Sequence, residues 1–292
     1  MAMIGGPTGS GKTDLAMEIA KRRGWEILSA DSGQSRRGLE VGTASPTGLQ
    51  RRLVVHHLVG DLSPNDPDSV VGFLERARTV LSTPGADLLA VGGTGQYLEV
   101  LRRGLDAAPP PDPTLRAALE LRLRAEGHQT LWEELQGICP DPPPDARQNP
   151  VRLLRAMEKA VLRSRGIEGH AHPALAPECP VFALRWPREL LHRRIAERME
   201  DMFVRGWLEE VDILRASCPA DAPAWKCIGF LPLREVLEGT QELSSAKSRI
   251  VEATRQYAKR QETFLRNRLS PHWIDGTLTV SEQADLLESL LA

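Results

Sequence analysis

The feature that most constrains this chain is an eight-residue segment close to its start, Gly6-Pro7-Thr8-Gly9-Ser10-Gly11-Lys12-Thr13. It fits the pattern G-x-x-x-x-G-K-[ST] of loops that wrap around a polyphosphate. A mostly apolar run at residues 1–5 precedes it, and residues 14–22 carry apolar side chains at helical spacing. In the order strand, loop, helix, the loop's backbone N–H groups and the positive end of the helix dipole meet the phosphate oxygens. Both flanks therefore favour a di- or triphosphate site over a chance glycine-rich turn.

The last two residues of this loop extend the prediction. In loops of this kind the lysine, here Lys12, reaches the terminal phosphate. The hydroxyl of the following residue, Thr13, is a suitable ligand for Mg²⁺. The motif predicts what is bound but not which reaction follows.

Composition sets limits on the partners and the compartment. The 292 residues carry a formal net charge of −2, so contact with a nucleic acid requires a local basic patch. The four cysteines form no C-x-x-C pair, which favours free thiols in a reducing compartment. No run approaches the ~18 apolar residues of a membrane span, and the start has no signal-peptide pattern. We therefore expect a cytoplasmic protein that has no membrane partner.

The order of the patterns predicts an α/β fold: a P-loop parallel-sheet core with a small all-helical insertion domain and a helical C-terminal part. The strands of the sheet are expected at residues 1–5, 25–30, 87–91 and 181–186. Composition changes at the proline-rich residues 107–113, after which only helical patterns occur until about residue 180. We therefore expect a core formed by residues 1–110 and 179–292, with the insertion at residues 111–178.

Polar residues follow two of the expected strands. Asp31 comes directly after the strand at 25–30, and Gly92, Gly93 and Thr94 follow the strand at 87–91. Open α/β sheets bind ligands at the carboxyl ends of their strands, so we expect these residues near the phosphate loop. A phosphoryl-transfer enzyme usually has an acid after the second of these strands, whereas this chain has two glycines and a hydroxyl. A plain turn is the alternative for the glycine pair.

Two helical segments carry basic residues at notable spacing. Arg194 and Arg198 are four residues apart, as in a phosphate clamp or a solvated surface pair. Within residues 247–268, seven Lys or Arg stand against two Glu. A solvated helix face explains such a run, but in a chain of net charge −2 a nucleic-acid backbone is an equal alternative.

Several further segments, taken together with the loop, resemble the tRNA dimethylallyltransferases over about residues 1–275. Those in the first half of the chain are Ser29-Ala30-Asp31-Ser32, Gly42-Thr43-Ala44-Ser45-Pro46, His56-His57-Leu58 and Val91-Gly92-Gly93-Thr94 with Tyr97. Those in the second half are Arg152-Leu153-Leu154-Arg155-Ala156-Met157-Glu158, Leu191-His192-Arg193-Arg194-Ile195 and Thr254-Arg255-Gln256-Tyr257-Ala258-Lys259-Arg260-Gln261.

The resemblance implies a reaction. The enzyme would transfer the dimethylallyl group of dimethylallyl diphosphate to N6 of the tRNA adenosine 37, beside the anticodon, and release diphosphate. Asp31 would take the proton of N6, and Thr94 would bond the bridging oxygen of the leaving group. The loop from Gly6 to Thr13 would hold the diphosphate with Mg²⁺, and Arg194 and Arg198 would close over it.

The resemblance also implies that the partner is the anticodon stem-loop of tRNA, bound by a monomer. Besides Asp31 and Thr94, the implied tRNA contacts are Ser32, Gly33, Gln34, Arg116, Val151, Arg152, Leu153, Leu154, Arg155, Lys226, Cys227, Ile228, Gly229, Phe230, Arg255 and Lys259.

The chain departs from the family pattern directly after Asp31-Ser32. Where an aliphatic pair and a tyrosine are common before a basic residue and glycine, it has Gln34-Ser35-Arg36 before Arg37-Gly38. It also has Ser45-Pro46 where Lys-Pro is usual, and Leu231 where a polar residue is common. These differences lie near the expected tRNA-facing loop.

Two other functions remain as alternatives. A small-molecule kinase or an adenylate prenyltransferase would use the same loop but would need no basic helix and no helical insertion. A non-enzymatic RNA-binding or nucleotide-switch protein would bind tRNA without changing it. Charge reversal at Arg255 and Lys259 tests the first alternative, and the mass of the tRNA product tests the second.

Overall fold

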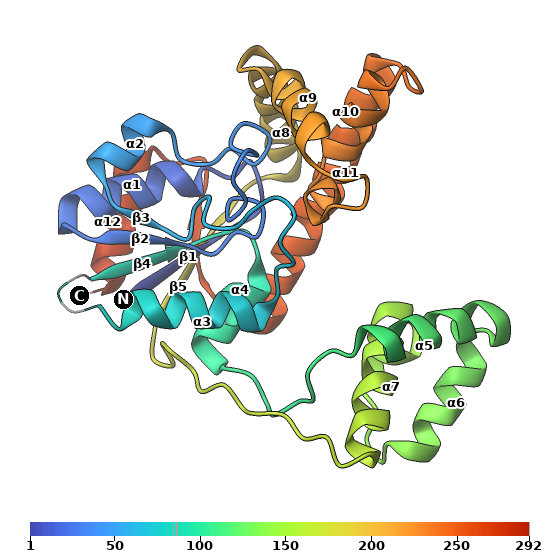
Figure 1. The fold of residues 1–292 in the computed structure, drawn as a ribbon. Helices are drawn as coiled ribbons and strands as arrows, with labels where there is room; N and C mark the ends of the chain where they lie inside the picture. Colours follow the sequence, from blue (N-terminus) through green and yellow to red (C-terminus); the bar gives the residue numbers. More distant parts are fainter. Residues whose placement is uncertain (84, 86, 292) are drawn as a thin grey trace. The chain divides into compact units, whose positions relative to one another are not determined.

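The computed structural model describes residues 1–83, 85 and 87–291. Six parallel strands form one sheet in the order β3-β2-β4-β1-β5-β6 (Figure 1). In chain order they are β1 (Ala2–Gly5), β2 (Glu26–Ser29), β3 (His56–His57), β4 (Leu88–Val91), β5 (Val181–Arg185) and β6 (His272–Asp275). The α/β fold with a parallel sheet is therefore confirmed.

Helices cover both faces of the sheet, and further helices lie beyond the carboxyl ends of its strands (Figure 1). Those that belong to the sheet-containing unit are α1 (Lys12–Arg23), α2 (Gly48–Leu53), α3 (Val70–Leu81), α4 (Gly95–Arg103), α8 (Arg188–Val204), α9 (Trp207–Ser217), α10 (Phe230–Leu237), α11 (Leu243–Phe264) and α12 (Val280–Leu291). A short 3₁₀ turn, Pro223–Lys226, precedes α10, and a π-helical turn, Leu265–Leu269, ends α11. Within the described residues, no helix is both long enough and apolar enough to cross a membrane.

Strand β1 lies at the centre of the sheet and carries the phosphate loop at its carboxyl end. Its residues are all buried, as expected for a strand covered on both faces. Met3 pairs with Ala90 of β4 on one side and with Val181 of β5 on the other. The pairing fixes the start of the loop because both neighbours of β1 belong to the same rigid sheet.

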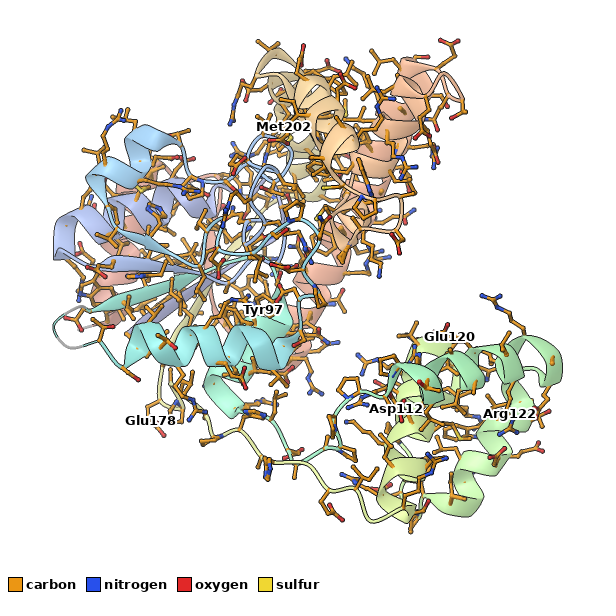
Figure 2. The ribbon with its side chains drawn as sticks, viewed as in Figure 1. Tyr97, Asp112, Glu120, Arg122, Glu178 and Met202 are labelled. Atoms are coloured by element: carbon orange, nitrogen blue, oxygen red, sulfur yellow. The ribbon has the colours of Figure 1, made fainter. Side chains whose placement is uncertain are left out.

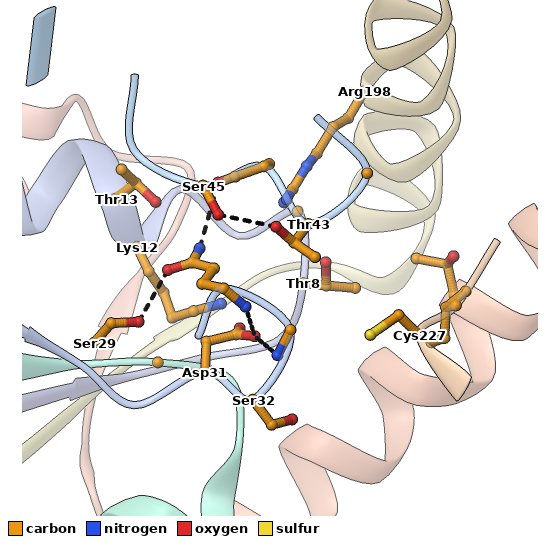
Figure 3. Close-up of a pocket in the computed structure, with 18 of the residues that line it drawn as sticks. Thr8, Lys12, Thr13, Ser29, Asp31, Ser32, Thr43, Ser45, Arg198 and Cys227 are labelled. Atoms are coloured by element: carbon orange, nitrogen blue, oxygen red, sulfur yellow. Dashed lines mark hydrogen bonds between the residues drawn. The ribbon is translucent and has the colours of Figure 1, made fainter. Parts of the chain in front are cut away.

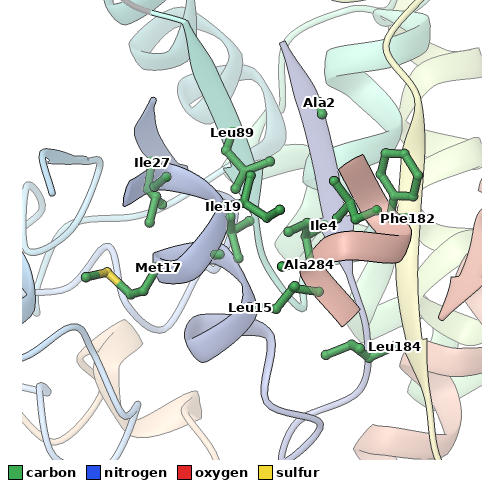
Figure 4. Packing of buried hydrophobic residues seen from close by; sticks show 14 of the residues in the cluster. Ala2, Ile4, Leu15, Met17, Ile19, Ile27, Leu89, Phe182, Leu184 and Ala284 are labelled. Atoms are coloured by element: carbon green, nitrogen blue, oxygen red, sulfur yellow. The ribbon is translucent and has the colours of Figure 1, made fainter. Parts of the chain in front are cut away.

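The core of the sheet forms against α1 and α12 (Figure 4). Ile4, Leu15, Ile19, Leu89 and Phe182 are fully buried there. Complete burial of a side chain of this size contributes about 1.5–3 kcal/mol each. On the opposite face lie α3 and α4 (Figure 1), joined by stacked aromatic rings.

A second core holds the helical part of this unit together. Trp207 of α9 packs edge-on against Phe230 of α10, and both are nearly inaccessible to solvent. Ala246 and Ile250 of α11 belong to the same cluster. Helix α11 therefore links this lobe to the sheet, since its other end packs beside β1 and β4, where Leu265 and Gln261 lie close to Gly5 and Gly93.

A separate compact unit, Gly104–Pro173, interrupts the core. It contains α5 (Pro113–Glu126), α6 (His128–Ile138) and α7 (Pro150–Ser164), with a 3₁₀ turn at Pro144–Arg147. Asp112 caps α5 by accepting from the N–H of Leu115 at 3.0 Å, and Figure 2 labels it at the start of this helix. The insertion was expected at 111–178, but the observed unit starts earlier, at Gly104, and ends earlier, at Pro173. The segments that lead into and out of its helices pair with each other through Leu105 and His172, which places both in this unit.

Candidate active site

One large cavity of about 1160 Å³ opens at the carboxyl edge of the sheet. Three parts of the chain supply its predicted residues: the phosphate loop, the turn after β2, and α8 with the segment before α10 (Figure 3). The predicted site residues that line it are Thr8, Gly9, Ser10, Gly11, Lys12, Thr13, Asp31, Ser32, Gly33, Gln34, Arg194, Arg198, Lys226, Cys227 and Ile228. Gly6, Pro7, Thr94, Gly229, Phe230, Arg255 and Lys259 do not belong to its lining.

The phosphate loop has the backbone shape that its glycines allow. Gly9 and Gly11 have φ angles of 80° and 92°, which side-chain-bearing residues rarely adopt. Gly11 precedes the first turn of α1. The N–H groups of that turn, which have no partner within the helix, therefore lie at the end of α1 that borders the cavity. The Lys12 Nζ donates to the carbonyl of Pro7 at 2.9 Å, which folds the side chain back over the loop.

Cations gather around this loop. Burial lowers the pKa of Lys12 to about 8; the carboxylate of Asp31 raises this pKa, and the guanidinium of Arg198 lowers it further. Burial also lowers the pKa of Arg198 itself. In Figure 3 the side chains of Lys12, Asp31 and Arg198 come from three different elements into one space. A bound polyanion would relieve the repulsion between the two cations.

The outer side of the loop is held by two side chains. Arg194 Nε donates to the carbonyl of Gly9 at 2.9 Å, and Trp186 Nε1 donates to the carbonyl of Ser10 at 2.9 Å. The guanidinium of Arg194 lies 4.3 Å from the centroid of the Trp186 ring. These bonds hold two loop carbonyls in place, and Arg194, which also lines the cavity, therefore joins the loop to α8.

A buried amide connects this loop to the turn after β4. Gln261 of α11 accepts from the N–H of Thr8 at 2.8 Å and donates to the carbonyl of Gly93 at 2.8 Å. Only 5% of Gln261 is exposed. A Cβ on Gly93 would collide with this amide, so the glycine is required for the close approach.

Asp31 lies at the start of a tight turn that its own side chain stabilises. Its Oδ1 accepts from the N–H of Gly33 at 3.0 Å and from that of Gln34 at 3.4 Å. Within the described part of the chain, Oδ2 accepts no hydrogen bond, so it remains available to a ligand. Thr94 is joined to the same turn, because its hydroxyl accepts from the N–H of Ser32 at 3.1 Å and donates to Ser32 Oγ at 3.3 Å. Asp31 and Thr94 therefore follow the ends of the neighbouring strands β2 and β4, and Thr94 is hydrogen-bonded to Ser32, the residue next to Asp31.

The predicted tRNA contacts in the sheet-containing unit fall into two groups, those that line the cavity and those that do not. Lys226, Cys227 and Ile228 line the cavity, and burial raises the pKa of the Cys227 thiol to about 11. Phe230 is wholly buried in the helical core, so its side chain is not accessible to RNA. On α11 the cavity is lined by Ile250, Thr254, Tyr257, Arg260 and Gln261, whereas Arg255 and Lys259 do not belong to its lining.

The insertion carries the remaining predicted contacts. Arg116 pairs with Glu120 at 3.0 Å, Arg152 with Asp145 at 2.7 Å and Arg155 with Glu158 at 2.8 Å. Val151 is exposed, but Leu153 and Leu154 are buried in the core of the insertion. The prediction that these two leucines contact tRNA therefore does not hold for their side chains.

The metal prediction depends on one hydroxyl. Thr13 lines the cavity beside Lys12, in the first turn of α1. Within the described residues, no three His, Cys, Asp or Glu side chains cluster as a metal site. Mg²⁺ commonly keeps several waters and takes few protein ligands besides substrate phosphates, so the site around Thr13 fits this ion.

Sequence reasoning missed the structural roles of Trp186 and Gln261 and the position of Arg36, which also lines the cavity. Trp186 is the last residue of the strand expected at 181–186, and Gln261 ends a motif quoted above, so their positions carried some signal. Their bonding partners lie 176 and 253 residues away, which no local pattern reveals.

The fold and the site define a P-loop protein whose phosphate cradle opens into the same cavity as a carboxylate at the next strand end. Residues 34–268 match the IPP transferase family, and residues 1–53 match the isopentenyl transferase family. The chain belongs to the IPP transferase family.

Relatives and solved structures agree with this assignment. The chain is 37% identical to a tRNA dimethylallyltransferase of Geobacter metallireducens over 94% of this chain and 92% of the relative. It is 38% identical to one of Thermus thermophilus over 91% and 89%. A crystal structure of the tRNA isopentenylpyrophosphate transferase of Bacillus halodurans superposes with a TM-score of 0.73 at 28% identity, covering 99% and 94% of the two chains.

Proposed function

We propose that this protein transfers the dimethylallyl group from dimethylallyl diphosphate to N6 of the adenosine beside the tRNA anticodon. The observation that carries the proposal is that the phosphate loop and Asp31 line the same cavity. The loop supplies cations and N–H groups for a diphosphate, and Asp31 supplies a base for an amine. Relatives that cover nearly the whole chain are named for this reaction.

The site has two tasks in this reaction. A bond forms between N6 and C1 of the dimethylallyl group while the bond from C1 to the diphosphate oxygen breaks. Adenine N6 is a poor nucleophile, so the rate must come from positioning and from stabilising the departing diphosphate. The N–H groups of the loop and the cations Lys12, Arg194 and Arg198 would meet that charge. Thr94 is not part of the cavity lining but bonds Ser32, which is, and its hydroxyl would turn from Ser32 Oγ to the bridging oxygen.

The proton of N6 would go to Asp31 Oδ2. The amine becomes more acidic as the new C–N bond forms, so an ordinary carboxylate suffices as the base. The Asp31 Oδ1 bonds to its own turn would hold Oδ2 in place during the transfer. Mg²⁺ bound at Thr13 would supply further neutralisation of the leaving diphosphate.

The target adenosine would have to leave its stack, at a cost of a few kcal/mol. Contacts to the RNA from Lys226, Cys227, Ile228 and the basic face of α11, including Arg255 and Lys259, would offset this cost. The basic residues of the insertion would add to them: the exposed Arg152, the half-buried Arg116 and Arg155, and the backbone of residues 151–154. We place the reaction in the cytoplasm, in accord with four cysteines that are all free thiols, and we propose that a monomer carries it out.

The test is direct. The purified protein is incubated with tRNA, dimethylallyl diphosphate and Mg²⁺, and the tRNA is digested to nucleosides for mass spectrometry. We expect a prenylated adenosine from the wild type and none from Lys12→Met. A parallel reaction with free AMP separates tRNA from small-molecule prenyl transfer. Tight tRNA binding without any prenylated nucleoside would contradict the proposal.

A further inference from the structure

Arg36 stands where the chain departs from its family, at a position where tyrosine is common. It is only 6% exposed, yet it lines the cavity together with Asp31 and Cys227. A nearly buried arginine facing a ligand cavity needs a reason, because removing a guanidinium from water is costly unless its charge is compensated.

The hydrogen bonds of Arg36 leave one side of its guanidinium free. Nη1 donates to the carbonyls of Ser63, Pro64 and Asp66, at 3.3, 3.3 and 2.8 Å. Within residues 1–83, 85 and 87–291, Nε and Nη2 donate to nothing. Neither nitrogen is fully buried without a hydrogen-bond partner, as Nε of Arg255 is, so both are accessible. The free side of the guanidinium therefore reaches the cavity.

The acids of this region have other partners. Asp66, within the bonded loop, accepts from the N–H of Ser63 at 2.8 Å, and Asp61 and Asp68 pair with Arg76 at 2.9 and 3.2 Å. No ion pair in the described part of the chain includes Arg36, and the three carbonyls that it bonds carry no net charge. The site thus holds a cation, nearly buried, with two donors in a fixed fork directed at a space for ligand. Such a fork matches two oxygens of a phosphate group.

We propose that Arg36 binds a phosphodiester of the RNA segment that carries the target adenosine. The inference rests on the proposed function, because the RNA is its substrate. The other source of a phosphate is the diphosphate donor, but that group has its own cations in Lys12, Arg194 and Arg198. Arg36 is instead bonded to the loop at residues 63–66, beyond the turn of Asp31. It would fix the backbone beside the flipped nucleotide.

The first experiment measures affinity against salt. Arg36→Met and wild type are compared for binding of an anticodon stem-loop RNA between 50 and 200 mM salt. We expect about tenfold weaker binding and a slope of log K against log salt reduced by about 0.7, the value for one phosphate of a single strand. Inorganic pyrophosphate should bind both proteins within about twofold. Arg102→Met is the matched control, since Arg102 bonds a backbone carbonyl at Leu269 outside the cavity.

The second experiment remains decisive if Arg36→Met disturbs the loop at residues 63–66. Each phosphodiester flanking the target adenosine is replaced in turn by an uncharged methylphosphonate. At one linkage the replacement should weaken binding to the wild type and to Arg36→Lys, but not to Arg36→Met. Equal penalties in all three proteins at every linkage would overturn the inference while leaving the transferase activity intact. A loss of pyrophosphate affinity with unchanged RNA affinity would assign Arg36 to the donor instead.

Discussion

The side-chain amide of Gln261 holds the backbone N–H of Thr8 and the carbonyl of Gly93 at 2.8 Å each. One residue of α11 thereby spans the gap between the phosphate loop and the turn that carries Thr94. In the proposed reaction the loop binds the diphosphate and Thr94 bonds its bridging oxygen. The bridge by Gln261 therefore sets the distance between two groups that act on one leaving group.

We predict that Gln261→Leu lowers kcat about 10- to 100-fold with a smaller change in KM, because Thr94 would be misplaced mainly in the transition state. Steady-state kinetics with tRNA and dimethylallyl diphosphate measures the split. Gln283→Leu is the control, since Gln283 is equally buried and bonds two backbone carbonyls away from the cavity. If Gln261 acts through Thr94, its substitution should cost less than about twofold in a Thr94→Ala background. Additive losses would assign it a general structural role.

Asp31→Asn should lower kcat by about 10²–10⁴, the range for loss of a general base. The substitution keeps an oxygen that can accept from Gly33 and Gln34, so the turn should survive. Single-turnover prenyl transfer and binding of the stem-loop RNA, measured on the same protein, separate chemistry from affinity. Wild-type turnover in this variant would remove Asp31 from the role of base.

The lowered pKa of Lys12 predicts how diphosphate binding depends on pH. In the free protein this pKa is about 8, so the ammonium loses its proton as the pH rises above 8. The affinity of the wild type for inorganic pyrophosphate should then fall by up to tenfold per pH unit. Lys12→Met lacks this ammonium, so any pH dependence of its affinity reports the ionisation of pyrophosphate itself and serves as the correction. Calorimetry from pH 6.5 to 9.5 measures the difference. A constant ratio of the two affinities across this range would contradict the prediction.

The same shift affects the stability of the unliganded protein. The unfolded chain holds the Lys12 proton up to pH 10.5, whereas the folded chain releases it near pH 8. Between these values the unfolded state binds more protons, so this residue makes the free energy of unfolding rise with pH.

Gly92→Ala should destabilise the protein by at least about 2 kcal/mol, because a Cβ there would meet the backbone carbonyl of Ala30. The two strand ends cannot separate without breaking the pairing of β2 with β4. Gly137→Ala is the contrast: nothing lies near its Cβ position in α6, and alanine should stabilise that helix by about 0.5–1 kcal/mol. Urea unfolding of both variants checks the opposite signs.

The parts of the fold that depend on local spacing could be predicted from the sequence. Strands β1, β2, β4 and β5 lie within the expected ranges 1–5, 25–30, 87–91 and 181–186, and α1 covers the helical pattern at 14–22. The short helix α2 and the separate helix α9 are not among the expected elements; Gly206, with a φ of 92°, forms the turn between α8 and α9. The local pattern therefore predicts whether a segment is a strand or a helix better than it predicts where one helix ends and the next begins.

The site was predictable to the same degree. Asp31 and the phosphate loop were placed correctly in one cavity because parallel strands end at one edge of the sheet. The burial of Leu153 and Leu154 was overlooked although their spacing with Met157 marks a core face of α7. Arg36 and Gln261 could not be assigned, because their partners come from loops that only the folded chain brings together.

The position of β1 has a consequence for biosynthesis. The ribosome makes the phosphate loop before β5, Trp186 and Gln261, which fix that loop and emerge only after the whole insertion. Nascent chains that end before α11 would therefore carry the glycines without their supports and should bind anions poorly. Catalytic competence would arise only after α11 has been made, so products truncated before it would sequester little of the donor.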